Sequence, residues 1–532
     1  MKRVLWPRIK ALANSICLWP YVFSCVLLLS QSLWWAYERL YGKDMPMLFC
    51  MGVAALGSVI LAIPLSNLFC LAFRRLRRVF APREAGRKIP FLWLWVLCFV
   101  LWIPTFLAYY PGILAYDFYS QYVQYFEQQF CSNHPLAHTW LMGKILEIGI
   151  GLFGFNNRAA ALYPIVQMLL ASAAMAYVVY ELQSFRLPRW LLIIAAGFYF
   201  MLPMTPVMMI STTKDVLFVC AFLVGLMKII PLCADSFRLK QAIPAAVFLT
   251  LSLLLRHNAI LGLLFTIAAL SVATGCRKEL RRKWALVFLA VILAGVSVDW
   301  GLERLLQAQK GSNAEMLSVP AQQLSYVSIN REDELTEEDN AKLNWYGINK
   351  AYHPWIADDV KNNMSIANFN AEPVEFFKFW HSLGVRFPGD YWHVFLTQSE
   401  PLWYFEKEPI LMAKDCYLEF SYQPDEFPLQ SKFARLLMVD RILFGSDALI
   451  LKIPVLSLLH HPAFYFWTLL AVLAALLHTK QYSYLVLPLL PLGYLTTLFF
   501  AACILPRYCL PGFYAAPVIL IVCLRAIANA RQ

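Results

Sequence analysis

Charged residues are scarce in this chain of 532 residues, because they make up 15% of it whereas 60% of its residues are apolar. An average soluble domain carries about a quarter charged residues. Apolar runs of roughly 20 residues recur along the chain, and each is long enough to cross a hydrocarbon core of about 30 Å as a helix. The composition therefore excludes an ordinary soluble protein. It predicts an all-α polytopic membrane protein with about 12 transmembrane helices.

Several catalytic and metal-binding motifs are also missing. The sequence has no Walker A loop, no HExxH and no GxSxG, so ATP-driven transport and zinc proteolysis lack support. Its 13 cysteines include no CxxC pair. The net charge of +12 does not indicate a nucleic-acid partner, because the segment 301–440 holds 21 of the 33 acidic residues and the basic residues form short clusters beside apolar runs. That distribution is typical of cytoplasmic loops.

The basic clusters predict the orientation of the chain. The segment 74–88 carries seven basic residues and one acid, which places it in the cytoplasm. The next apolar run, Pro90–Tyr110, then leads outward and delivers the polar loop 111–135 to the outer side. We expect a multi-pass protein of the bacterial cytoplasmic membrane with both termini in the cytoplasm.

Successive transmembrane helices cross the membrane in opposite directions, and two arrangements of the helices after residue 135 satisfy this requirement. In the preferred one, Leu136–Gly154 is a half-buried or surface helix, and Ala242–Leu255 and Ala259–Gly275 are two separate helices. In the other, Leu136–Gly154 crosses the membrane and 242–275 is one helix, which at 34 residues would be about 50 Å long.

The sequence divides into four parts. They are a two-helix segment with its basic loop (1–89), a membrane core (90–300), an α-rich soluble extracytoplasmic insertion (301–445) and C-terminal membrane helices (446–532). The insertion has normal soluble composition, and Thr336 followed by Asp339 predicts a capped helix start there.

An ionisable side chain at membrane depth costs at least a few kcal/mol, so each one is a functional candidate. Asp117 follows a helix end and a Pro-Gly turn, and its carboxylate can act as a general base or a metal ligand. His134 precedes Pro135 at the expected start of a helix, where an anion is favoured. Lys214 and Asp215 also open a helix, with Thr212 and Thr213 as N-cap candidates. Structural alternatives remain open, namely a solvated loop acid, a helix-starting proline and a capped helix end.

Three polar residues, Arg256, His257 and Asn258, interrupt an apolar stretch and are expected to face a cavity or a polar neighbour. Arginine can hold phosphate oxygens bidentately, which makes Arg256 and Arg507 candidates for phosphate binding. An interhelical bridge at Arg256 and an interfacial anchor at Arg507 are the structural alternatives.

The order of these motifs along the chain resembles the GT-C superfamily of membrane glycosyltransferases, which includes protein mannosyltransferases, the lipid A aminoarabinose transferase and oligosaccharyltransferase. It looks closer still to a bacterial family of uncharacterised multi-pass proteins grouped with them. The segments that carry the resemblance lie between residues 109 and 517 and are YYPGILAYDFYSQ, NHPLAHTWLMGKILEIGIGLFG, STTKDVLF, LLRHNAILG, SVPAQQLSYV and LPRYCLPGFYAAP.

The resemblance implies a polyprenyl-phosphate sugar donor and an extracytoplasmic envelope glycan, lipid or protein as acceptor. Asp117 corresponds to the catalytic acid, His134 lies where the family binds lipid phosphate or metal, and Asp215 matches a recurrent acid. Arg256 and Arg507 look like donor-phosphate ligands, to which Lys214, His257 and Asn258 are added. If a divalent metal ion binds, Asp117 and His134 are its expected ligands.

Other functions and roles stay open at this point. A transporter or flippase of a lipid-linked or anionic precursor would use the same buried charges, and a glycan polymerase or ligase would share the chemistry. The insertion either binds the acceptor, through residues such as Gln322, Gln323, Trp392 and Trp403, or serves as a structural cap.

Overall fold

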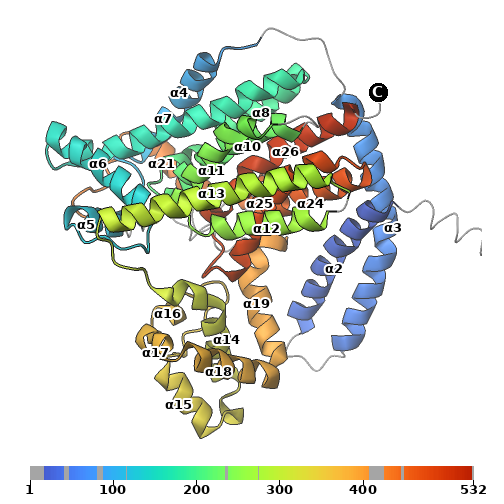
Figure 1. The fold of residues 1–532 in the computed structure, drawn as a ribbon, viewed down its shortest axis with the longest axis vertical. Coiled ribbons are helices and arrows are strands. Elements are labelled where there is room, and N and C mark those ends of the chain that lie inside the picture. The colour runs from blue at the N-terminus through green and yellow to red at the C-terminus, as the bar shows by residue number, and fades with distance from the viewer. Residues whose placement is uncertain are drawn as a thin grey trace, which may run out of the picture.

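The computed structural model of the chain describes residues 17–40, 47–80, 88–114, 117–233, 238–273, 275–405, 424–444 and 449–529. These residues form helices and no β-strand, with two isolated β-bridges, Ile113 with Ser211 and Cys131 with Gln309. Figure 1 shows a bundle of long helices with a smaller helical unit beside one end of it.

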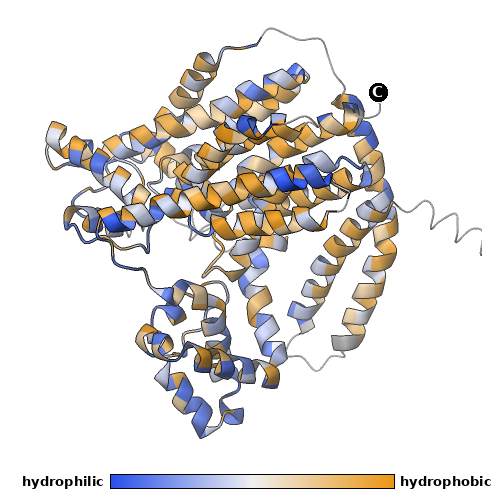
Figure 2. Ribbon diagram, in the orientation of Figure 1, coloured by the Kyte–Doolittle hydropathy of each residue, from blue (hydrophilic) through white to orange (hydrophobic). Residues whose placement is uncertain are grey.

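The helices of the bundle follow the apolar runs of the sequence, and Figure 2 shows that hydrophobic residues predominate along them. Its N-terminal half contains α2 (Leu18–Leu40), α3 (Met47–Val79), α4 (Phe91–Ala108), α5 (Asp117–Phe126), α6 (Leu136–Phe153), α7 (Asn157–Leu182), α8 (Arg189–Met201), α9 (Met204–Met209), α10 (Lys214–Ile229), α11 (Ile243–Leu255), α12 (Ala259–Val272) and α13 (Lys278–Leu305). Its C-terminal half contains α21 (Ala434–Phe444), α22 (Leu449–Lys452), α23 (Pro454–His460), α24 (Pro462–His478), α25 (Val486–Thr497) and α26 (Leu510–Asn529).

Eight helices among the described residues are long and apolar enough to cross a membrane, or nine if the bent pair α23 and α24 is one span. This confirms an all-α membrane protein but not the expected count of about 12 spans. Part of the difference lies in α8, α11 and α12, whose 13, 13 and 14 residues are short of the about 20 that a bilayer core requires.

Helices α4 and α7 lie antiparallel and fix where the polar segment between them emerges. Gln183 at the end of α7 bonds the backbone of Ile89 just before α4. At the other end, Gly112 has φ +133°, and a Cβ there would lie 2.5 Å from Pro164 of α7. The segment that contains α5 and α6 therefore leaves and returns at one end of this pair. This return agrees with the first of the two arrangements, although α6 is one of the eight helices long and apolar enough to cross a membrane.

The second difference between the two arrangements concerns residues 242–275. Helices α11 and α12 are separated at residues 256–258 and are not one long helix. Helix α11 packs antiparallel to α10, with Leu249 against Gly225, and α12 packs closely on α25, since a Cβ on Gly262 would lie 2.8 Å from Tyr494. This also agrees with the first arrangement.

The helices after α13 form a separate unit with its own hydrophobic core, built around residues such as Leu324, Phe376 and Leu383. They are α14 (Ser318–Asn330), α15 (Glu337–Trp345), α16 (Asp358–Lys361), α17 (Ile366–Ala371), α18 (Pro373–Arg386) and α19 (Pro388–Trp403). The expected cap is present, because Thr336 and Asp339 form a reciprocal capping box. Helix α19 leads back to the bundle, where the Trp467 indole donates to the carbonyl of Trp403.

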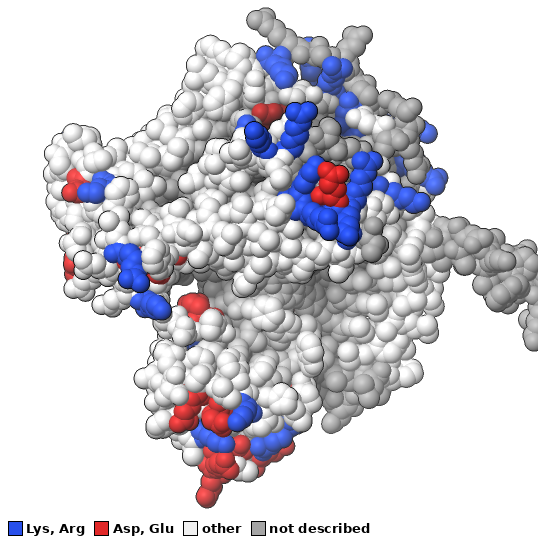
Figure 3. Space-filling view, in the orientation of Figure 1, with Lys and Arg blue, Asp and Glu red and all other residues white. Residues whose placement is uncertain are grey.

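The two ends of the bundle differ in the charged side chains that they carry. Lys and Arg gather over the start of α13 and nearby helix ends (Figure 3). We call this the basic end, and it includes the end of α7, the end of α10 and the start of α13. The opposite end holds the loop before α5, the start of α10, the break at 256–258 and Arg507. We call it the site end.

Candidate functional site

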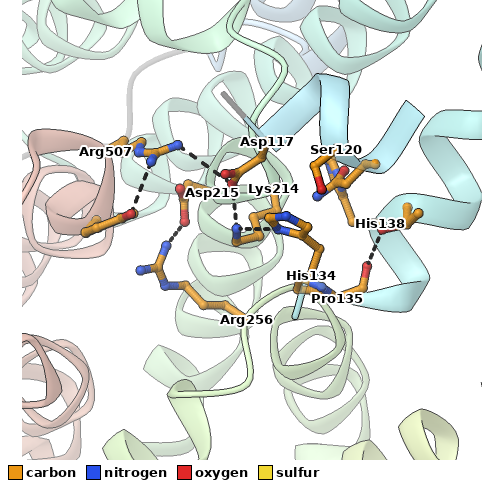
Figure 4. Close-up of polar contacts among 12 residues, drawn as sticks. Asp117, Ser120, His134, Pro135, His138, Lys214, Asp215, Arg256 and Arg507 are labelled. Atoms are coloured by element: carbon orange, nitrogen blue, oxygen red, sulfur yellow. Dashed lines mark hydrogen bonds and ion pairs between the residues drawn. The ribbon is translucent and has the colours of Figure 1, made fainter. Parts of the chain in front are cut away.

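The candidate site is a cluster of five charged side chains that come from four separate segments of the chain (Figure 4). Asp117 opens α5, Lys214 and Asp215 open α10, Arg256 lies at the break after α11, and Arg507 lies in a short 3-10 turn, Pro506–Cys509. The fold thus brings Asp117 together with residues that lie 97 to 390 positions further along the sequence.

Asp117 is held by two cations. The Lys214 ammonium donates to Asp117 Oδ2 at 2.5 Å, and Arg507 NH1 lies 3.8 Å from the same oxygen. The Asp117 side chain is 15% exposed. Burial tends to raise its pKa, but Lys214 and Arg507 outweigh this effect and hold the pKa well below its usual range. Asp117 is therefore ionised at physiological pH.

Lys214 also lies beside His134. Its ammonium is 3.5 Å from His134 Nδ1, so it stands between the carboxylate and the imidazole. Burial lowers the pKa of His134, although the charge of Asp117 opposes this effect. The imidazole of His134 is therefore neutral at pH 7.

His134 precedes Pro135 and α6, as expected. The two residues before it, Ser132 and Asn133, are held in place because their side chains accept hydrogen bonds from the backbone N–H groups of Gly311 and Ser312.

A second ion pair lies next to the first. Arg256 NH1 pairs with Asp215 Oδ1, and the Asp215 side chain is 1% exposed. The guanidinium of Arg256 stacks over Tyr508, 4.3 Å from its ring centre, and the Tyr508 hydroxyl lies 3.1 Å from Arg507 NH2. The two pairs are thus joined through one aromatic ring. Cation–aromatic contacts of this kind orient a guanidinium in a site from which water is largely excluded.

Asn258 and His257 both face polar neighbours, as expected, but only Asn258 lies against the cluster, and the third expected feature, a cap of α10, is absent. Asn258 contacts Arg256 Nε at 3.2 Å, so it supports the cluster from beside it. His257 instead faces Asp299 of α13, at 3.4 Å. The expected hydroxyl cap of α10 is wrong, because no side chain caps its start and Thr212 donates to the carbonyl of Ile113.

The sequence reasoning missed Tyr508 and Asp299 as partners of these residues. Asp299 carried a usable signal, because it is an isolated acid in the apolar run AGVSVDWGL. Tyr508 is adjacent to Arg507, but its stacking on Arg256 depends on tertiary structure. A buried chain that joins His138 to Gln121 at 2.7 Å and to Tyr163 at 2.6 Å was also missed.

The insertion offers less for ligand binding than expected. Gln322 and Gln323 are buried and donate to the backbone carbonyls of His353 and Tyr391. Trp403 is also buried, whereas Trp392 is 63% exposed. Of the four residues considered for acceptor binding, Trp392 alone is available at the surface.

Asp117 and His134 remain the predicted ligands for a divalent metal ion. The Lys214 ammonium lies between them, in the position where a shared cation would bind. Among the described residues, the group of three metal-ligating side chains within 4.8 Å of one another is Cys17, Cys70 and His478, which is a different part of the bundle. A metal ion at the site would therefore have to displace Lys214.

A family model described as a family of unknown function (DUF6020) matches residues 126–532, which is 407 of the 532 residues. The chain therefore belongs to that family. The match contains every residue of the cluster except Asp117. No curated protein and no solved structure matches the sequence.

Proposed function

We propose that this member of the DUF6020 family is a membrane glycosyltransferase that moves a sugar from a polyprenyl-phosphate donor to an extracytoplasmic acceptor. One observation carries the proposal. A carboxylate that can activate an acceptor hydroxyl lies within 4 Å of two cations that can bind the leaving phosphate, Lys214 at 2.5 Å and Arg507 at 3.8 Å. The resemblance to GT-C enzymes supports the same assignment.

The positive-inside rule supports placing this cluster on the outer side of the bacterial cytoplasmic membrane. The basic end of the bundle carries Arg277, Lys278, Arg281, Arg282 and Lys283 at the start of α13. If that end faces the cytoplasm, the site end faces outward and both termini lie in the cytoplasm. The insertion beside the site end is then extracytoplasmic and can meet an envelope acceptor.

The charges of the cluster suit a phosphate. Lys214, Arg256 and Arg507 carry three positive charges against two on Asp117 and Asp215, so an incoming anion is compensated. The three cationic side chains are 16%, 10% and 7% exposed. Charges act more strongly where water is excluded. Arginine can also hold two phosphate oxygens at once.

The chemistry follows from these positions. The acceptor oxygen gives its proton to Asp117 and attacks the anomeric carbon, while the bond from that carbon to the phosphate oxygen breaks and the phosphate keeps the electron pair. Lys214 and Arg507 stabilise the charge that develops on the phosphate. With Lys214 and Arg507 paired to it, Asp117 is a weak base, because these cations hold its pKa low. A donor phosphate that attracts these cations raises the basicity of Asp117 only when the donor is bound.

The test is sugar transfer in proteoliposomes supplied with radiolabelled polyprenyl-phosphate sugars and crude envelope acceptor. Asp117→Asn should lower transfer by at least about 100-fold, the usual contribution of a positioned acid or base. Asp333→Asn, an exposed acid in the insertion, is the matched control and should keep the wild-type rate. Equal transfer by wild type and Asp117→Asn would refute the catalytic assignment.

The same vesicles separate the alternatives. A donor that reaches the opposite leaflet without transfer of its sugar would identify a transporter or flippase and overturn the proposal. Products that lengthen by repeated units would identify a glycan polymerase, whereas a single large block moved to the acceptor would identify a ligase.

A further inference from the structure

The basic end of the bundle contains a cavity that the proposed transfer does not use. It has a volume of about 510 Å³ and lies between α7, α10, α26 and the turn before α25. Lys214 and Lys228 lie near opposite ends of α10, and 14 residues at 1.5 Å each separate them by about 21 Å. The cavity is therefore distinct from the Asp117 cluster.

Positive charge dominates the lining of this cavity. Arg186, Lys228 and Arg525 line it together with one acid, Glu181. The Arg525 side chain is buried and donates to the carbonyl of Phe80 at 2.9 Å, which engages one of the five N–H donors of its guanidinium. The Lys228 ammonium lies 4.8 Å from the centre of the Tyr177 ring. Arg525 and Lys228 thus contact neutral groups, and the lining keeps a surplus of two positive charges.

Cations at the ends of helices are common, because the helix dipole favours them there. That effect explains one basic residue at each helix end but not a cavity of this size between them. Ser184, Tyr484 and Asn529 add neutral polar groups to the lining. Basic pockets between membrane helices on the cytoplasmic side are typical sites for the phosphate of anionic lipids.

We propose that this cavity binds a phosphate-bearing anionic group at the basic end of the bundle. The source that its position favours is the headgroup of an anionic phospholipid, because the exposed Arg186 lines the cavity together with apolar side chains such as Phe185 and Val522. The proposal does not depend on glycosyl transfer, since none of these residues belongs to the Asp117 cluster.

The experiment measures thermal stabilisation of the full-length protein in detergent. Three ligands are titrated separately: phosphatidylglycerol, phosphatidylcholine and inorganic phosphate. The double variant Arg186→Gln/Lys228→Gln removes two lining cations, and Arg525 is kept because it also bonds Phe80. Arg189→Gln/Lys240→Gln, two basic residues outside the lining, is the matched control for lost charge.

Phosphatidylglycerol should raise the unfolding temperature more than phosphatidylcholine does, because binding to the folded state stabilises it. The lining variant should bind it at least about ten-fold more weakly, and the control should match wild type. If inorganic phosphate alone gives the full shift, the phosphate site is supported and its source is a soluble anion. Equal shifts with both lipids and none with phosphate, or an undiminished shift in the lining variant, would overturn the proposal.

Discussion

The two ends of α10 use similar residues in opposite ways. At its start, each carboxylate is matched to a cation, Asp117 with Lys214 and Asp215 with Arg256. At its end, Lys228 and two arginines face a cavity with one acid. Paired charges hold a fixed geometry before any ligand arrives, whereas a surplus of one sign awaits a ligand of the other. Both ends carry a surplus of positive charge, one at the site end through Arg507 and two in the cavity. The comparison teaches that the pairing of carboxylates with cations separates a preorganised reaction site from an anion-binding cavity.

Breaking the buried pair at the site end should have the largest effect on stability. Asp215→Asn leaves Arg256 buried without its counter-ion, and removal of one partner of such a pair costs about 3–5 kcal/mol. Titration of the purified protein with SDS in mixed micelles measures this loss. Asp299→Asn is the control, because Asp299 is 23% exposed and pairs with a histidine. An equally large loss in both variants would mean that the pairing of Asp215 has no special role.

Removing one lysine from each end tests whether the two ends have separate functions. Lys214→Gln should reduce glycosyl transfer by about 100-fold, because it removes a cation that stabilises the leaving phosphate. Lys228→Gln should leave transfer unchanged and weaken anionic lipid binding. The transfer assay and the lipid titration are applied to both variants. Loss of transfer in Lys228→Gln would indicate that the two ends belong to one translocation path for the substrate, and it would favour a transporter.

The site end should also respond to pH in a defined direction. Burial lowers the pKa of His134, so the folded protein prefers its neutral form. Protonation then favours the unfolded state, where the ordinary value is about 6.5. Wild-type stability relative to His134→Gln should be constant above about pH 7.5 and fall as the pH drops through about 6.5. Denaturation curves from pH 5 to 8 measure the difference, and a difference that rises on acidification would contradict the assignment.

Sequence reasoning located the parts of the site but not its connections. The start of α6 after Pro135, the start of α10 at Lys214 and the break at Arg256 all follow local signals, and the structure confirms them. The pairing of Asp117 with Lys214 spans 97 residues, and no local pattern encodes it.

The errors in the sequence reasoning have the same origin. Thr212 and Thr213 were the candidates to cap α10, but neither side chain does so. The Thr212 hydroxyl instead bonds Ile113 from another segment, since tertiary contacts override local capping preferences. Gln322 and Gln323 looked available for a ligand, yet they satisfy buried backbone carbonyls, a requirement that becomes visible only when the helices are packed.

The smallest expected effect comes from the one acid of the cavity. Among the residues that the structure describes, Glu181 is the only carboxylate that lines it, so Glu181→Gln raises the surplus of positive charge from two to three. Phosphatidylglycerol should bind a few-fold more tightly, because an added charge near a membrane surface contributes about 1 kcal/mol. The same titration in detergent measures the change, with Glu303→Gln at the far end of α13 as the control for a lost acid. Weaker binding in Glu181→Gln would show that the carboxylate orients the cations, and the cavity would then resemble the paired charges at the start of α10.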